Sequence, residues 1–157
     1  MMNAETRRTR STPAKSEHFR RLERMYLGAP NNDYYQPEIT IGEGTAELRI
    51  AIDPKFFHAA GAAHGSVYFK AMDDAAFFAA NSVVEDVFVL TTSFNIHLLR
   101  PVTEGTLIAK GTLVSATRSL LIADAELKDQ KGHLVGRGTG SFMKGRTRLE
   151  DIKGYAD

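Results

Sequence analysis

Alternating apolar and polar positions identify four candidate strands along the chain. Between residues 45 and 52 every second residue is apolar, which is typical of an antiparallel strand with one face in the core and one in water. The same alternation returns over residues 107–113, 121–127 and 134–142. Residues 116–119 and 130–132, between these rows, have the composition of turns. The pattern predicts an antiparallel sheet.

A helical period predicts two further elements. From residue 16, Phe19, Leu22, Met25 and Tyr26 follow helical spacing among charged residues, and glycine, proline and asparagine then end the pattern. Residues 64–81 are rich in alanine and apolar on nearly every side, which favours a central helix. At 1.5 Å per residue this helix would be about 27 Å long, enough to cross several strands.

Small residues in the inward rows of the predicted strands indicate where this helix packs. Glycine inside a strand costs roughly 0.5–1 kcal/mol relative to alanine, so a row of glycines usually marks the close approach of another backbone. We interpret that backbone as the central helix. The expected fold is α+β, a curled antiparallel sheet wrapped around one long helix, with an extra N-terminal helix.

Length and composition suit one domain with terminal extensions. We divide the 157 residues into a basic tail over 1–15, one domain over 16–146 and a C-terminal tail over 147–157. The basic tail has little to bury. We expect it to be disordered and favour this interpretation over a nucleic-acid or targeting role. Without cysteine, a signal-peptide core or a membrane-spanning run, we expect a cytoplasmic protein with no nucleic-acid or membrane partner.

Two neighbouring carboxylates, Asp73 and Asp74, interrupt the apolar helix. Carboxylates are rarely buried without a partner or a task, so one of them should face a cleft or a subunit interface. Adjacent helical positions point about 100° apart, so the two acids cannot share one role. Asp73 as a purely structural interface acid stays an alternative, and we expect Asp74 to be a solvated or capping acid. The scattered histidines give no reason to expect a metal site.

A set of spaced motifs resembles the hotdog-fold acyl-CoA thioesterases of the PaaI-like family. The motifs are GAAHGS at 61–66, an aspartate nine positions after His64, Thr91, LRPV at 99–102, Gly105, and the stretches 129–132 and 136–142. This resemblance covers about residues 53–142. It implies hydrolysis of an acyl-CoA to acid and coenzyme A, no cofactor beyond that coenzyme, and a homodimer or dimer of dimers with active sites between subunits.

The resemblance also implies roles for four residues. By position, Asp73 would activate water or attack the thioester carbonyl, and the Gly65 backbone N–H would polarise that carbonyl. His64 would orient the turn before the helix, and Thr91 would support the aspartate or hold the water. The candidate substrate-binding residues are His58, Ser66, Arg100 and Arg118.

The sequence departs from the family pattern at three positions. His58 stands where many relatives have asparagine, Ser66 replaces a second glycine, and Asp74 follows Asp73 where threonine or asparagine is common. Two other functions stay open, a non-catalytic acyl-CoA binder and a hotdog hydratase or dehydratase. Some bulky helix residues should line the acyl pocket, and aromatic and medium-chain groups both suit them; these residues are Phe69, Met72, Phe77 and Phe78. On charge alone, Lys144 and Arg146 join Arg100 and Arg118 as candidates for the coenzyme's phosphates.

Overall fold

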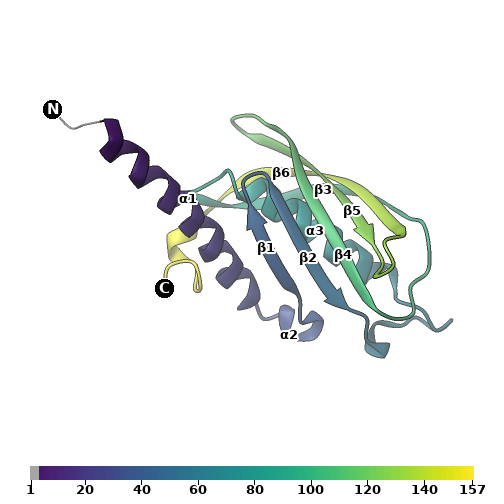
Figure 1. The fold of residues 1–157 in the computed structure, drawn as a ribbon. Helices are drawn as coiled ribbons and strands as arrows, with labels where there is room; N and C mark the ends of the chain where they lie inside the picture. Colours follow the sequence, from purple (N-terminus) through teal and green to yellow (C-terminus); the bar gives the residue numbers. More distant parts are fainter. Residues whose placement is uncertain (1–3) are drawn as a thin grey trace.

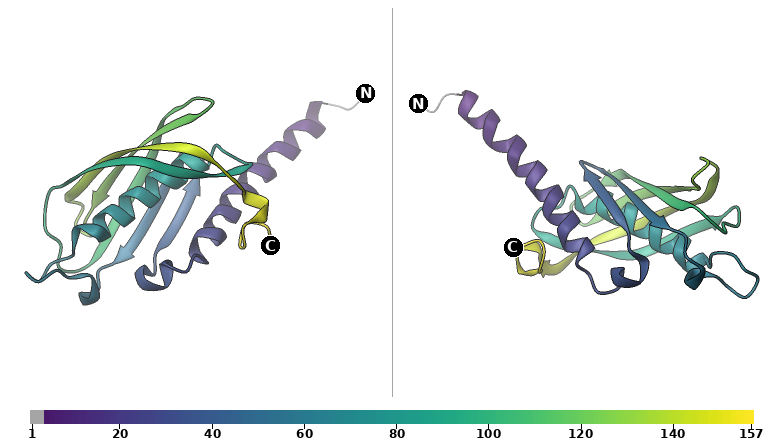
Figure 2. Two further views of the ribbon diagram at one scale, coloured as in Figure 1. Left: turned by 180° about the vertical axis from the view of Figure 1, so that it is seen from behind. Right: turned by 60° about the horizontal axis from the view of Figure 1, so that its bottom comes forward.

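A curved antiparallel sheet wraps around one helix, as the sequence predicts. The computed structural model describes residues 4–157, with side chains from residue 15 onward. Its helices are α1 (Ala4–Leu27), α2 (Asn32–Tyr35) and α3 (Gly65–Asn81), and its strands are β1 (Glu38–Gly42), β2 (Thr45–Ala51), β3 (Val87–Leu98), β4 (Thr106–Ala116), β5 (Leu120–Lys128) and β6 (Leu134–Arg148). The strand order is β1-β2-β4-β5-β6-β3. Figures 1 and 2 show α3 against one face of the sheet, with β6 and β3 curling over it.

The predicted inward rows face the central helix. In β5, the row from Leu121 to Leu127 is almost fully buried, and the row of β4 is buried from Leu107 to Gly111. A Cβ atom built on Gly111 would overlap the carbonyl oxygen of Ala75 in α3. The helix backbone therefore lies directly on β4, and only glycine leaves room for it there.

The glycines of β6 have a different neighbour from the one expected. At Gly140 a Cβ atom would lie 2.5 Å from the ring of Phe94, and the same ring crowds Gly138. Phe94 lies on β3 directly opposite Gly140. The close approach that these two glycines permit is therefore that of an aromatic side chain on the adjacent strand, and the interpretation of the whole row as a helix contact is wrong for them.

The alternation of apolar and polar residues did not predict the two edge strands, β1 and β3. β1 is short, and the exposure of β3 does not alternate, because Thr91, Thr92 and Ser93 are all exposed at the open edge of the sheet. A β-bulge between Thr91 and Ser93 also shifts the register, so the inward side chains do not keep one period of two along the whole of β3. Only the family resemblance indicated a strand after Thr91.

The N-terminal helix is present and begins earlier than predicted. α1 starts at Ala4, whereas helical spacing indicates a start at residue 16. Residues 1–3 of the expected disordered tail lie outside the described part of the chain. The buried positions of α1 with described side chains begin at His18 and include Leu22, Met25 and Tyr26, which pack against the rest of the domain. Figure 1 shows α1 beside β1 at the edge of the sheet.

The C-terminal residues that we separated as a tail pack back onto the domain. Leu149 and Tyr155 are buried. The hydroxyl of Tyr155 lies 2.7 Å from Nδ1 of the buried His18, whose Nε2 donates to the carbonyl oxygen of Asn81 at 3.1 Å. Because a carbonyl can only accept, Nε2 carries the hydrogen and Nδ1 accepts from the tyrosine in the neutral ring. This bridge joins α1, α3 and residues 147–157.

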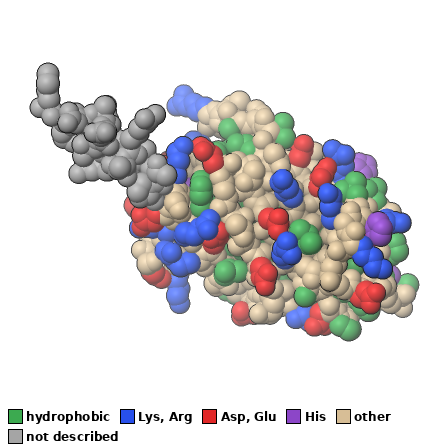
Figure 3. All heavy atoms as spheres, viewed as in Figure 1, with side chains coloured by type: hydrophobic (Ala, Val, Ile, Leu, Met, Phe, Trp, Pro, Cys, Tyr) green, Lys and Arg blue, Asp and Glu red, His purple; other side chains and the backbone are tan. Residues whose placement is uncertain are grey.

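The outer face of the sheet carries charges of both signs. Figure 3 shows acidic and basic side chains interspersed over the strands. Glu47 and Arg49, two positions apart on β2, form one exposed ion pair of this face. Such mixed charge is typical of a solvated surface. In the part of the chain that the structure describes, we find no helix with the length and apolar character needed to cross a bilayer.

Candidate active site

Asp73 lies halfway along α3 and faces a cavity. The cavity has a volume of about 740 Å³ and is bounded by α1, α3, β3 and the C-terminal residues. The hydroxyl of Thr91 on β3 donates to Oδ1 of Asp73 at 2.9 Å, so the contact expected from the sequence is present. Among the described residues, Asp73 has no ion-pair partner. It is a partly buried carboxylate with an oxygen free to act in the cavity.

The surroundings of Asp73 make it a stronger base than an ordinary aspartate. Burial raises its pKa to about 6, while the hydrogen bond from Thr91 lowers that pKa. The charge of Asp74 raises the pKa further and that of Lys70 lowers it. A carboxylate with a pKa near 6 is ionised at neutral pH and still accepts a proton readily, which suits a general base.

Asp74 is engaged by two other side chains, and its interpretation as a solvated acid is wrong. Lys70 Nζ lies 2.7 Å from Oδ2 of Asp74, and the two side chains are 10% and 16% exposed. The hydroxyl of Tyr26 donates to the same oxygen at 2.6 Å. Burial, and then the charge of Asp74, raise the pKa of Tyr26, so its hydroxyl keeps the proton that it donates. Of the two neighbouring acids, Asp73 is the one left free.

Aromatic side chains form the apolar wall of this cavity. Phe77 and Phe78 line it from α3 and Phe88 lines it from β3. Of the other two bulky helix residues considered in the sequence, Met72 is fully buried in the core. Phe69 is 40% exposed and packs edge-on against Phe94. The wall thus identifies which bulky residues could contact an acyl group.

The start of α3 is held by His64. Its Nδ1 accepts from the backbone N–H of Ser66 at 3.0 Å and lies 2.9 Å from the Ser66 hydroxyl, which makes His64 the N-cap. The expected orienting contact is therefore present. The backbone N–H of Gly65 makes no hydrogen bond within the described chain. Unpaired N–H groups at a helix N-terminus favour negative charge, so Gly65 can polarise a carbonyl oxygen.

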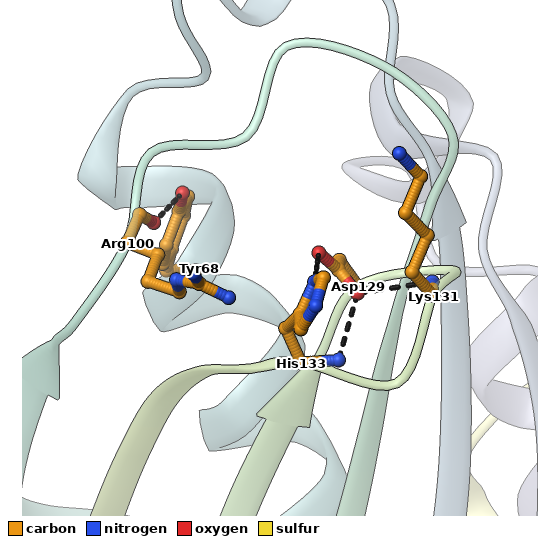
Figure 4. Close-up of polar contacts among 5 residues, drawn as sticks. All are labelled: Tyr68, Arg100, Asp129, Lys131 and His133. Atoms are coloured by element: carbon orange, nitrogen blue, oxygen red, sulfur yellow. Dashed lines mark hydrogen bonds and ion pairs between the residues drawn. The ribbon is translucent and has the colours of Figure 1, made fainter.

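A second, smaller cavity of about 310 Å³ lies at this end of the helix. His58, Gly65, Tyr68 and Arg100 are among its lining residues. Figure 4 shows Tyr68 donating to the backbone oxygen of Arg100, at 2.7 Å. The turn between β5 and β6 lies nearby, where His133 Nδ1 is 3.0 Å from Asp129 Oδ2. His58 and Arg100, two of the four candidate substrate-binding residues, thus line the same cavity as Gly65.

Arg118 does not join this group. It lies in the turn between β4 and β5, whereas Arg100 precedes β4 at the other end of that strand. A strand of this length spans about 33 Å at 3.3 Å per residue. Lys144, another candidate for the phosphates, lies at the Arg118 end of the sheet, because its neighbour Met143 pairs with Leu120. Within one chain, Arg100 and Arg118 cannot bind the same phosphate group.

One chain does not bring Gly65 and Asp73 together. Asp73 follows Gly65 by eight positions on the same helix, so the two are about 12 Å apart along its axis. A donor that polarises a carbonyl must lie about 3 Å from its oxygen, and a general base must lie about 3 Å from the water that attacks its carbon. Within one chain, the Gly65 N–H and the Asp73 carboxylate therefore cannot act on the same carbonyl group.

The structure adds Lys70 and Tyr26, which the sequence analysis missed. The spacing of Lys70 four positions before Asp74 is a recognisable signal for a helical ion pair. Tyr26 gave no such signal, because it is 48 positions from Asp74 in sequence. Among the described residues, no group of three or more histidine, aspartate or glutamate side chains is placed to hold a metal ion.

Comparison with known proteins agrees with this architecture. The sequence profile of the thioesterase superfamily matches residues 60–136. A protein of Saccharolobus solfataricus whose name assigns it to the esterases is 25% identical over 112 residues, which cover 71% of this chain and 80% of that protein.

Solved structures share the fold. The E. coli PaaI protein from the phenylacetic acid degradation operon matches with a TM-score of 0.78 and 19% identity, over 85% of this chain and 97% of that one. Thioesterase HI1161 from Haemophilus influenzae matches with a TM-score of 0.70 and 19% identity, over 76% of this chain and 85% of that one. These matches confirm the resemblance seen in the sequence. The chain therefore has the hotdog fold, and its match to the thioesterase superfamily over residues 60–136 supports a thioester hydrolase.

Proposed function

We propose that the protein is an acyl-CoA thioesterase whose active site combines Asp73 of one subunit with Gly65 of the partner subunit. The observation that carries this proposal is the separation of the two groups. Each chain holds a free carboxylate of raised pKa and a free backbone N–H, about 12 Å apart on one helix. A second copy in antiparallel orientation supplies the missing half of each site.

The open edge of the sheet supports this assembly. β3 pairs with β6 on one side only, and it carries Leu90 and Leu98, which are 52% and 50% exposed. An exposed edge strand with apolar side chains is usually covered by another chain. Thr91, which holds Asp73, lies on the same strand, so a copy paired along β3 would lie next to the cavity. We propose a homodimer, or a dimer of such dimers.

The reaction needs one base and one polarised carbonyl. Asp73 takes a proton from water while the resulting hydroxide adds to the carbonyl carbon, and the oxygen's negative charge is held by the N–H of the partner subunit's Gly65. The carbon–sulfur bond then breaks, coenzyme A leaves as a thiolate and a proton returns to the sulfur. Direct attack by Asp73 would give an anhydride that water opens, with the same products.

The two cavities suit the two parts of such a substrate. The larger one, with Phe77, Phe78 and Phe88, fits an aromatic or medium-chain acyl group. The smaller one, with His58 and Arg100, fits the pantetheine and phosphate side, since arginine binds phosphate well. Coenzyme A is then part of the substrate, and we expect no further cofactor.

The experiment is to measure thiol release from a panel of acyl-CoA esters with the wild-type protein and the Asp73→Asn variant. We expect turnover of at least one aromatic or medium-chain ester by the wild type, and loss of that turnover in the variant. Binding of acyl-CoA without any thiol release would instead make the protein a non-catalytic binder. Turnover of an enoyl-CoA without thiol release would indicate a hydratase.

A further inference from the structure

Lys70 is placed to pair with either of two carboxylates. It precedes Asp73 by three positions and Asp74 by four, and both spacings bring helical side chains together. The structure pairs Lys70 with Asp74, at 2.7 Å, and leaves Asp73 without an ion pair in the described chain. The hydrolytic mechanism above uses neither Lys70 nor Asp74.

Side chains from outside α3 hold this choice in place. The hydroxyl of Tyr26, on α1, donates to the same Asp74 oxygen that accepts from Lys70. The Lys70 ammonium also lies 5.2 Å from the ring centres of Tyr26 and Tyr35, within reach of a cation–π attraction. The hydroxyl of Tyr26 fixes the Asp74 carboxylate, and the two aromatic rings attract the ammonium beside it.

We propose that Asp74 is a positioning residue that holds the Lys70 ammonium away from Asp73 and so keeps the Asp73 carboxylate unpaired and able to accept a proton. The inference rests on the proposed role of Asp73 as the base. It explains why an acid follows the catalytic position in this chain. A neutral residue at position 74 would leave the ammonium free to turn to its other helical neighbour, Asp73.

The groups that face Asp73 come from every element around the cavity. Thr91 on β3 donates to it, Tyr26 on α1 and Lys153 in the C-terminal segment line the same cavity, and Lys70 and Asp74 lie on its own helix. Removing the negative charge of Asp74 and releasing the ammonium act in the same direction. Both favour the ionised form of Asp73 and make it a weaker base.

The test is the pH dependence of turnover in a set of matched variants. With Asp74→Asn, we expect the acid limb of kcat to move to lower pH by about one unit, and the plateau kcat to fall several-fold with a smaller change in KM. Lys70→Met removes the cation and should move the limb to higher pH. The double variant Asp74→Asn, Lys70→Met should return it close to the wild-type position.

Tyr26→Phe is a milder variant that keeps both charges, so it tests the inference even where Asp74→Asn lowers stability. It removes one hydrogen bond to Asp74, and we expect a small shift in the same direction as that of Asp74→Asn. An acid limb that stays in place in Asp74→Asn and Tyr26→Phe would overturn the inference. If Asp73→Asn is inactive and the limbs do not move, only this inference fails, whereas an active Asp73→Asn variant refutes the proposed function along with it.

Discussion

The first turn and the middle of α3 differ in chemistry although they belong to one helix. The first turn offers a free N–H at Gly65, next to a small cavity with Arg100. The middle offers a shielded carboxylate, Asp73, next to a larger apolar cavity. The first can stabilise a developing negative charge, and the second can take a proton. The difference teaches that one helix carries a donor and a base, the two groups that the proposed hydrolysis needs, and that its own rigidity keeps them apart.

The largest expected effect comes from the middle of the helix. Asp73→Asn keeps the shape of the side chain and removes its basicity, so kcat should fall by about 10²–10⁴-fold, the usual contribution of a positioned general base. Binding of the acyl-CoA should survive, which calorimetry with the inactive variant can measure. Wild-type turnover in this variant would show that the carboxylate is structural. Size-exclusion chromatography must first show that the variant keeps its oligomeric state.

The role of the first turn can be tested by removing the backbone N–H donor of residue 65. Proline is favoured at the first helical position, and His64 has the extended backbone that a following proline requires, with φ −64° and ψ 146°. Gly65→Pro therefore deletes the N–H donor with little cost to the helix, and kcat should fall by about 10²–10³-fold.

Gly65→Ala is the matched control for that variant. It adds a Cβ atom 2.8 Å from Leu98 Cδ1, as proline also would, but it keeps the N–H. The side-chain tip of Leu98 can move, so we expect Gly65→Ala to retain much more activity than Gly65→Pro. Equal losses in kcat would mean that crowding against Leu98, and not the donor, explains the effect.

The turnover of the wild type should change gradually with pH, and this change is smaller than the losses expected from the substitutions. Because the pKa of Asp73 is raised to about 6, its base form is lost as the pH falls through that value. Turnover should be level above about pH 7 and should fall about tenfold for each unit well below pH 6. A stopped or continuous thiol assay across this range measures the limb. A plateau that continues unchanged to pH 4 would contradict the raised pKa.

The smallest effect is expected far from both parts of α3. The buried residues of α1 with described side chains start at His18, and the Lys15–Glu43 ion pair is exposed, so it should contribute little to stability. Deleting residues 1–15 should leave kcat unchanged and move the melting temperature only slightly. A large loss of activity would reveal a functional arm in the segment that we interpret as a tail.

The sequence predicts the elements that have a regular period of apolar residues, and it misses the features that depend on contacts between distant residues. The central helix, four strands and their turns follow from local period, and motif spacing singled out Asp73, Gly65, His64 and Thr91 as candidate site residues. The edge strand β3 lacked a continuous period because a β-bulge between Thr91 and Ser93 shifts its register and because its middle is exposed. Position along the chain could not show that Arg118 lies at the opposite end of β4 from Arg100.

The pairing of Asp74 shows the same limit at the site itself. Its i, i+4 spacing from Lys70 is visible in the sequence, but the spacing of Lys70 from Asp73 is nearly as favourable. In the structure Lys70 pairs with Asp74, and the same Asp74 oxygen accepts from the hydroxyl of Tyr26 on α1. Without the fold, nothing in the sequence places that hydroxyl beside the helix.

Mixing two inactive variants tests the shared site most directly. Chains with Asp73→Asn and chains with Gly65→Pro are mixed, unfolded and reassembled so that mixed dimers form. In each mixed dimer, one shared site has both substitutions and the other has neither. If half of the dimers are mixed and one site in each is intact, thiol release should recover to about one quarter of the wild-type rate. Recovery to this level is the result that the account predicts. If the mixture has no more activity than the separate variants, although mixed dimers form, Asp73 and Gly65 do not act across subunits and the account is contradicted.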